Sequence, residues 1–150
     1  MADTIWAVNP NAYIILEHWA DNGEETQLSD YGMMLWGQAT HAYQEGAMGW
    51  VSTSNFNNAV YKFRGWNDPH LVTFPESHDE ERIMYKTLAF GNTNNPDHNV
   101  QDLDVALQRT TLSQVFGLAH PGPKMMWMFG ELGYDVSIDD PCRICNKPIL

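Results

Sequence analysis

The stretch that decides the fold is LVTFPESHDEER, residues 71–82. An apolar run at 71–74 stops at Pro75, and a dense polar cluster follows it directly. In a parallel α/β sheet, ligands bind and catalytic side chains gather at the carboxyl ends of the strands. His78 and Asp79 stand at such an end. The position therefore predicts either hydrogen bonding to a polar substrate or proton transfer.

The same cluster has a purely structural interpretation. Ser77 is followed three residues later by Glu80. This spacing fits a capping box, in which the two side chains satisfy the free backbone groups at the start of a helix. On that interpretation the polar run begins a helix and has no chemical role. The two interpretations predict different things for the rest of the chain, so the other apolar runs decide between them.

Three further apolar runs predict strands, and the segments between them predict helices. The run Ala12 to Leu16 is continuous, which is the pattern of a strand buried on both faces. The remaining predicted strands are 32–36, 71–74 and 124–129. Helices are predicted at 38–47, 83–90 and 100–119, with helical spacing within 50–70. Residues 22–30 are predicted as a polar loop, and residues 1–11 as a loop or the frayed end of a helix. The connections are long enough for the crossovers that parallel strands need. The predicted fold class is α/β with about four parallel strands and crossover helices.

The helix at 100–119 has the clearest amphipathic pattern of the chain. Asn99 is its predicted N-cap, with Asp102 in the first turn. Its apolar residues lie largely along one face, which we expect to pack inward. They are Leu103, Ala106, Leu107, Val115, Leu118 and Ala119.

Carboxylates follow three of the apolar runs: Glu17, Asp79 and Glu131. If the strands are parallel, these acids converge on one rim of the sheet. Two acids from different strands suit glycoside hydrolysis, because one protonates the leaving oxygen while the other attacks or stabilises the sugar. The plain alternative for Glu17 is a solvated carboxylate or a helix cap.

Composition narrows the class of partner. The chain has 150 residues, the size of one domain, and its hydrophobic content of 43% is enough for a packed core. The net charge of −11 argues against nucleic acid and against anionic membrane surfaces. Neutral substrates remain compatible with this charge. No apolar run approaches the length of a membrane span.

The only cysteines are Cys142 and Cys145. Two thiols do not complete a four-ligand zinc site, and no thioredoxin-like setting surrounds them. We interpret them as two unrelated thiols, and they assign no compartment. No loop has the oxygen-rich spacing of a calcium site, so no cofactor or metal ligand is predicted from these residues.

Three motifs, taken together, resemble the α-amylase family, glycoside hydrolase family 13. Residues 14–21, IILEHWAD, are similar to the family's fifth-strand motif. Residues 74–79, FPESHD, resemble the seventh-strand motif, and residues 121–135, PGPKMMWMFGELGYD, resemble the eighth strand and its loop. Motif order and spacing agree with the family from about residue 9 to about residue 149. The segment SHDEER, residues 77–82, is similar to bacterial α-amylase and branching-enzyme-like members.

The resemblance implies roles for individual residues. It implies a (β/α)8 barrel that acts on α-1,4 linkages of starch-like α-glucans with retention of configuration. Glu17 would be the general acid/base. Asp79 would bind the hydroxyls of the sugar at the cleaved bond, and His78 would hydrogen-bond the same sugar. Ser77 stands where many members have Asn.

One departure from the family affects the mechanism. The family's nucleophile is an Asp at the end of the fourth strand, and residues 1–11 contain only Asp3, with no strand before it. The prediction is therefore a partial catalytic domain over 1–150, the C-terminal half of a TIM barrel with its fifth to eighth βα units, truncated at both ends. Many family members bind calcium, but through parts of the barrel outside this segment. We expect exposed barrel edges to permit self-association.

Two alternatives to hydrolysis stay open. A transglycosylase such as a branching enzyme would use the same residues and pass the glycosyl group to a glucan hydroxyl instead of water. A non-catalytic α-glucan-binding segment would keep His78, Asp79 and the aromatic side chains but turn nothing over. An unrelated α/β domain, whose acids are only caps and surface charges, is the third possibility.

Overall fold

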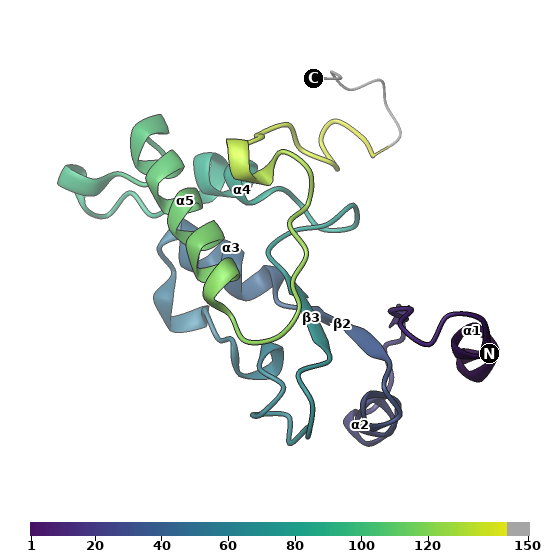
Figure 1. Cartoon of the computed structure of the whole chain (residues 1–150). Helices are drawn as coiled ribbons and strands as arrows, with labels where there is room; N and C mark the ends of the chain where they lie inside the picture. Colours follow the sequence, from purple (N-terminus) through teal and green to yellow (C-terminus); the bar gives the residue numbers. More distant parts are fainter. Residues whose placement is uncertain (144–150) are drawn as a thin grey trace.

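The computed structural model describes residues 1–143 (Figure 1). Its helices and strands alternate along the chain, and the strands form one parallel sheet in the order β1-β2-β3. The elements are α1 (Ala2–Val8), β1 (Ile15–Leu16), α2 (Asn22–Asp30), β2 (Met34–Gln38), α3 (Thr40–Met48), β3 (Leu71–Phe74), α4 (Ile83–Phe90) and α5 (Leu103–Ala119). The predicted α/β class with parallel strands is confirmed.

The sheet continues beyond β3 through a short extended segment. The Thr73 amide donates to the Pro123 carbonyl at 3.1 Å, and the Met125 amide donates to the Thr73 carbonyl at 2.9 Å. Thr73 and Lys124 form a parallel bridge. The predicted strand at 124–129 is therefore present only as this bridge, since the chain leaves the sheet after Met125. Neighbours in the sheet are also neighbours along the chain.

The first strand is shorter and more exposed than its sequence predicts. A continuous apolar run predicted burial on both faces, but Tyr13 is 88% and Ile15 is 41% exposed. Ile14, by contrast, is buried with Ala2 and Met33. The prediction is wrong because only the face of β1 that carries Ile14 is covered, whereas Tyr13 and Ile15 point to the opposite face, which residues 1–143 leave open.

The segment 22–30 is a helix, α2, and not the polar loop that its composition predicted. Asp21 caps it, since its Oδ1 accepts hydrogen bonds from the Gly23 amide at 2.9 Å and the Glu24 amide at 3.1 Å. The helix buries Glu25 and Ser29. Polar composition misled the prediction because the buried face of α2 carries paired polar groups instead of an apolar stripe.

The helix at 83–90 is confirmed as α4, and the helix predicted at 38–47 is confirmed as α3. Gly49 ends α3 with φ +87°, the left-handed conformation that favours glycine at this place. Residues 50–70 contain no α-helix, although the spacing of Phe56, Ala59 and Phe63 predicted one. They form 3₁₀ turns at Val51–Thr53 and Asn57–Ala59 instead.

The long helix α5 buries Ala106 as predicted, but most of its predicted apolar face is exposed. Leu103 is 58%, Val115 57% and Leu118 60% exposed, while small and polar side chains face inward. The inward side chains are Ala106, Thr110, Ser113, Gln114 and Gly117. Small residues are required because α5 lies close against α3 and α4. The predicted N-cap is also displaced, from Asn99 to Asp102.

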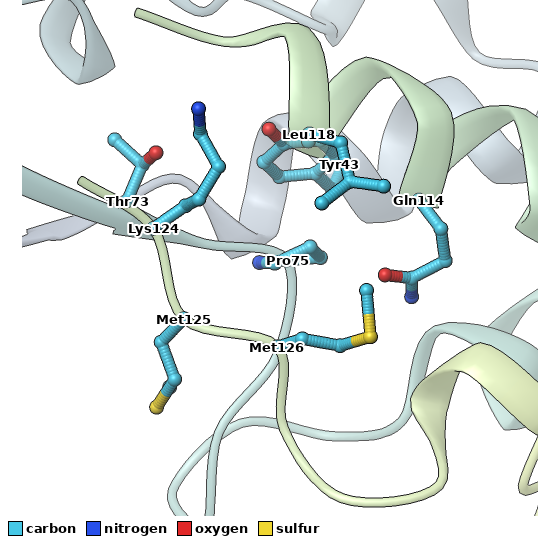
Figure 2. A pocket seen from close by; sticks show the side chains of 9 residues that line it. Tyr43, Thr73, Pro75, Gln114, Leu118, Lys124, Met125 and Met126 are labelled. Carbon is cyan, nitrogen blue, oxygen red and sulfur yellow. The ribbon is translucent and has the colours of Figure 1, made fainter. Parts of the chain in front are cut away.

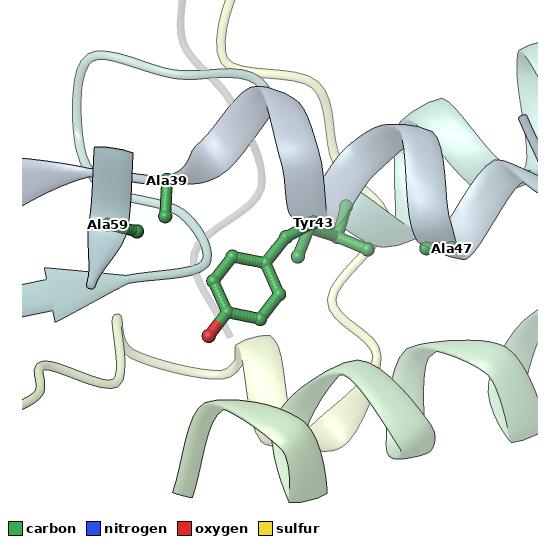
Figure 3. Close-up of a cluster of buried hydrophobic side chains, with 5 residues drawn as sticks. Ala39, Tyr43, Ala47 and Ala59 are labelled. Atoms are coloured by element: carbon green, nitrogen blue, oxygen red, sulfur yellow. The ribbon is translucent and has the colours of Figure 1, made fainter. Parts of the chain in front are cut away.

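Tyr43 of α3 joins the helical layer to the sheet. It packs with Ala39, Ala47, Ala59 and Ile83 and points from α3 toward α5 (Figure 3). Its hydroxyl is buried without a hydrogen-bond partner among residues 1–143, and burial raises its pKa to about 12. Beside it, α5 and the extended segment enclose a gap of about 20 Å³ (Figure 2). That volume holds about one water molecule.

A second cluster packs under α2, on the same face of the sheet as Thr73, which lies beside Tyr43. Leu35 of β2, Leu71 of β3 and Trp66 are almost fully buried together. Leu28 of α2 packs against them, so α2 covers this face. Among the helices of residues 1–143, none is long and apolar enough to span a membrane.

Candidate functional site

A cleft of about 530 Å³ opens at the carboxyl ends of the strands. Its volume lies within the range of about 300–1,000 Å³ that small-molecule sites occupy. Glu17, His78 and Asp79, all predicted from the sequence, line it together. The other lining residues are Trp19, Trp36, Gln38, Phe74, Ser77, Glu80, Met125 and Trp127.

Strand register explains why these side chains meet. Alternate residues of a strand point to the same face, so Trp36 and Gln38 share one face of β2. Gln38 is in register with Phe74 at the end of β3. Both lie on the face opposite Leu35 and Leu71, which pack under α2. The cleft is therefore built on the face of the sheet that α2 does not cover.

The β1 wall of the cleft carries Glu17 and Trp19. Both are exposed, Trp19 by 58%, and both follow the last residue of β1. The loop is held by Glu25 of α2, whose Oε1 accepts a hydrogen bond from the Ala20 amide at 3.2 Å. Glu25 is 3% exposed and paired with Arg64. The helix-cap alternative for Glu17 is wrong, because Asp21 caps α2.

The β3 wall carries His78 and Asp79. The His78 Nε2 and Asp79 Oδ2 atoms are 3.4 Å apart, and the His78 ring lies 5.7 Å from the Trp127 ring. Arg143 donates to Asp79 twice, to Oδ1 at 3.2 Å and to the backbone carbonyl at 2.9 Å. Both side chains are about half exposed (50% and 54%), so water and ligand hydroxyls can compete for this carboxylate.

The capping-box interpretation of the polar cluster is wrong in its essential point. Ser77 does bond Glu80, and its Oγ accepts from the Asp79 amide at 3.1 Å, but no helix begins there. The next helix, α4, begins at Ile83. These bonds hold a tight loop that presents His78 and Asp79 to the cleft.

Glu76, two residues before His78, anchors this loop from below. It is 2% exposed. Its Oε1 accepts from Arg82 Nη1 at 3.0 Å, and its Oε2 accepts from the Ile83 amide at 2.8 Å, at the first turn of α4. Arg82 also donates to the Met128 carbonyl at 3.0 Å and stacks over the Tyr134 ring. One buried pair therefore ties the β3 loop, α4 and the segment after Trp127 together.

Burial raises the pKa of Glu76 above its usual value, and this outweighs the lowering effects of the Ile83 amide and of Arg82. Glu131 adds a smaller rise through charge repulsion. Gly130 leaves the space for this carboxylate, because a Cβ at that position would collide with Glu76 Oε1. Glu76 lies below the cleft surface and does not line the cleft.

Glu131 does not join the cleft. The sequence predicted that it would converge with Glu17 and Asp79, but it is exposed on the 3₁₀ turn Gly130–Leu132 and does not line the cleft. The chain turns sharply at Phe129, whose φ is +66°. Two of the three predicted carboxylates therefore meet, and the third points elsewhere.

Four residues of the site were missed by sequence reasoning. Trp36, Gln38 and Glu80 line the cleft, and Glu76 supports it. The second apolar run was noted only for lacking a carboxylate. Strand alternation back from Gln38 would have found Trp36, because both lie on one face. Nothing local marks Glu76 as buried, since its partner Arg82 is held in turn by the Met128 carbonyl, which is far away in the sequence.

The cysteine prediction also needs a correction. Cys142 is disulfide-bonded, so the interpretation as two unrelated thiols is wrong at this position. Cys145 lies outside the described residues. Within residues 1–143, no group of three or more His, Cys, Asp or Glu side chains could hold a metal ion.

Comparisons with known proteins add no family. No protein-family model matches the chain, and no curated protein matches it. The likeness to glycoside hydrolase family 13 therefore stays a prediction from the three motifs.

The arrangement has the chemistry of a site for a neutral, polar ligand with apolar faces. Three indole rings, Trp19, Trp36 and Trp127, offer surfaces on which the C–H face of a sugar ring can stack. The carboxylates and the imidazole around them accept and donate hydrogen bonds to hydroxyl groups. A strongly anionic ligand is disfavoured, because Glu17, Asp79 and Glu80 all lie on the lining.

Proposed function

We propose that this chain supplies part of the catalytic site of a glycoside hydrolase acting on α-1,4 linkages of starch-like α-glucans. One observation carries the proposal: Glu17 and Asp79 lie about sixty positions apart in the sequence, yet they line one aromatic cleft at the carboxyl ends of parallel strands. Glu17 acts as general acid/base on the glycosidic oxygen. Asp79 and His78 bind hydroxyls of the sugar at the cleaved bond.

The proposal includes a finer fold, the C-terminal half of a (β/α)8 barrel. Its support is the order of the sheet, in which β1, β2, β3 and the segment at Lys124 are parallel and follow one another as in the sequence. A doubly wound sheet reverses its order at a switch point, whereas a barrel does not. The unpaired edge of β1 is then a surface through which copies of the chain can associate.

The retaining mechanism needs a second carboxylate as nucleophile, close to the acid/base. Among residues 1–143, the acids on the cleft are Glu17, Asp79 and Glu80. Asp79 is paired with Arg143, and Glu80 accepts from Gln38 at 2.7 Å. We therefore assign neither as nucleophile, and propose that this chain binds glucan while turnover requires a further carboxylate.

Because Asp79 is paired with Arg143, a second candidate is also favoured, a non-catalytic α-glucan-binding segment. It predicts binding that depends on Asp79 without turnover in any assembly. A transglycosylase is the third candidate, since the same residues would serve it. The products separate it from a hydrolase: a transglycosylase makes new branches, whereas a hydrolase makes new reducing ends.

Two measurements on the 150-residue chain test the proposal. Calorimetric titration with maltohexaose should detect binding that Asp79→Ala weakens by about tenfold or more, because a charge-assisted hydrogen bond is lost. Release of reducing sugar from soluble starch should be absent in the wild type and in Glu17→Gln. Absence of maltohexaose binding would overturn the proposal. Starch hydrolysis that disappears in Glu17→Gln would show that a nucleophile is supplied after all.

A further inference from the structure

The last described segment of the chain returns to the loop that carries Asp79. We call residues 135–143 the strap. The Ser137 hydroxyl donates to the Glu81 carboxylate, and the Ile138 amide donates to Glu81 Oε1 at 2.9 Å. Ser137 is 5% exposed, so this attachment is buried. Because Glu81 and Asp79 belong to the same polar run, the strap is anchored on the loop that presents Asp79 to the cleft.

A tight turn leads from this anchor to Arg143. Ser137 Oγ accepts hydrogen bonds from the Asp139 amide at 3.0 Å and from the Asp140 amide at 2.7 Å. Asp139 Oδ1 accepts in turn from Arg143 Nε at 3.0 Å, which orients the guanidinium group. Cys142, the neighbour of Arg143 in the sequence, is disulfide-bonded. The strap therefore holds Arg143 in a defined position.

Arg143 engages the carboxylate that the proposed function assigns to sugar binding. Its Nη1 donates to Asp79 Oδ1 at 3.2 Å, and its Nη2 donates to the Asp79 carbonyl at 2.9 Å. The other carboxylate oxygen, Oδ2, lies 3.4 Å from His78 Nε2. Both carboxylate oxygens of Asp79 thus have a partner in the free chain. A neutral sugar hydroxyl competes poorly for Oδ1, because a hydrogen bond between two charged groups is the stronger one.

The two ends of the strap differ in exposure. The anchor at Ser137 is buried, whereas Arg143 and Asp79 are 50% and 54% exposed. An exposed ion pair is weak, since water and salt screen it. Arg143 can therefore leave Asp79 while Ser137 stays bound to Glu81. A segment that is fixed at one end and releasable at the other is suited to cover a site reversibly.

We propose that Arg143 is an autoinhibitory residue: the strap closes on Asp79 in the free chain, and an α-glucan has to displace Arg143 before Asp79 binds its hydroxyls. Closure lowers the apparent affinity in proportion to the fraction of chains in which the strap is open. For an exposed ion pair the expected reduction is about threefold to fivefold. The inference rests on the proposed function and deepens it, because it adds a regulatory contact to the same site.

The dependence of glucan binding on ionic strength tests the strap. Maltohexaose is neutral, whereas salt weakens the pair between Arg143 and Asp79. In calorimetric titrations the affinity of the wild type should rise about threefold between roughly 0.02 M and roughly 0.5 M sodium chloride. Arg143→Gln should bind at the tighter level at both salt concentrations. Lys62→Gln is the matched control, because it removes the same charge from an exposed position outside the cleft and should behave as the wild type does.

Two further variants separate inhibition from a structural role of Arg143. Ser137→Ala removes the hydroxyl that anchors the strap and leaves Arg143 in place, so it should also raise the affinity for maltohexaose, by up to about threefold. In an Asp79→Ala background, Arg143→Gln should have no effect, since the contact that it removes is already absent. An arginine that only orients Asp79 for the ligand would instead weaken binding when it is replaced.

The outcomes distinguish the strap from the cleft. Binding by Arg143→Gln that equals or is weaker than that of the wild type at low salt would overturn the strap and leave the proposed function standing. A rise in affinity with salt that is as large in Arg143→Gln as in the wild type would also overturn it. No binding of maltohexaose by the wild type or by Arg143→Gln would overturn the proposed function, and the strap with it.

Discussion

The two walls of the cleft are built in opposite ways. The β1 wall carries Glu17 on a two-residue edge strand, and its loop is held from α2 through Glu25. The β3 wall carries His78 and Asp79 on a strand that is buried throughout, and its loop is tied from below by Glu76. In both walls the exposed chemical group is supported by a buried glutamate–arginine pair. The difference is that the β3 pair is more deeply buried and joins more segments.

The comparison indicates which wall loses more stability when its supporting ion pair is broken. Arg82 is 7% and Glu76 2% exposed, so their pair is almost dry. Arg64 is 18% exposed, so the pair in the β1 wall keeps some contact with water. Losing one partner of a dry pair leaves a buried charge uncompensated, which is far more costly than losing one partner of a wetter pair.

Glu76→Ala should therefore produce the largest effect in the molecule. It removes the partner of Arg82 and of the Ile83 amide, and we expect a loss of about 3–5 kcal/mol in the free energy of unfolding. Urea denaturation measures it. Glu24→Ala is the control, since Glu24 is 54% exposed and paired with the exposed His18, so its effect should stay within about 0.5 kcal/mol. Equal losses in the two variants would contradict the role of Glu76.

Glu25→Ala should produce the next largest loss in the free energy of unfolding. The Ala20 amide loses its acceptor and Arg64 loses its carboxylate, but Arg64 can turn toward water and still contacts the Trp66 ring. We expect a loss of about 2 kcal/mol, the cost of leaving a buried polar group without its partner. The same urea experiment measures it. A loss greater than that of Glu76→Ala would reverse the proposed order of the two walls.

Gly130→Ala perturbs the β3 wall without removing any charge. The added methyl group would collide with Glu76 Oε1, so the carboxylate or the turn at Gly130 must shift. Overpacking of this kind typically costs about 1–3 kcal/mol, and we expect about 1.5 kcal/mol here. Gly46→Ala serves as the comparison, because Gly46 lies inside α3, where alanine is the better helix former, and the added methyl group requires only a small shift of the Ser54 hydroxyl, 3.2 Å away. If Gly130→Ala were as stable as the wild type, this result would argue against tight packing around Glu76.

The pH dependence of stability provides a smaller and more specific test. Burial raises the pKa of Glu76 in the folded protein above its ordinary value of 4.5. Its contribution to stability is then complete below the unfolded value and declines as the pH rises through the folded value. In Glu76→Gln the side chain at this position does not ionise, so it contributes no such pH dependence. The unfolding free energy of the wild type minus that of Glu76→Gln should therefore fall as the pH is raised above 4.5. A rise in this difference would contradict the raised pKa.

Part of the fold was predictable because it depends on local signals. The apolar run at 71–74 and Pro75 set the bounds of β3, and the helix predicted at 38–47 forms as α3. The helix α2 was missed because its stability depends on a cap and on a pair between Glu25 and Arg64, which are far apart in the sequence. Most of the inward face of α5 was missed because close helix packing selects small residues over apolar ones.

The residues of the site also divide into those with a local sequence signal and those without one. Glu17, His78 and Asp79 were found because they stand directly after apolar runs and within motifs that resemble a known family. Glu76 and Arg82 were not, because the contact of Arg82 with the Met128 carbonyl joins segments that only the tertiary fold brings together. The residues that were found stand directly after apolar runs, whereas Trp36, inside a run, and Glu76 and Arg82, below the cleft, carry no such signal.

The tryptophans allow the most direct test of the central claim, that the two walls form one α-glucan-binding cleft. Of the six in the chain, Trp19, Trp36 and Trp127 line the cleft, and Trp6, Trp50 and Trp66 do not. The measurement is the shift of the indole N–H signals in a ¹H–¹⁵N spectrum during titration with maltohexaose. The account predicts that the three cleft signals move together and that the other three stay still. Movement of Trp6 alone, or no movement at all, would contradict it.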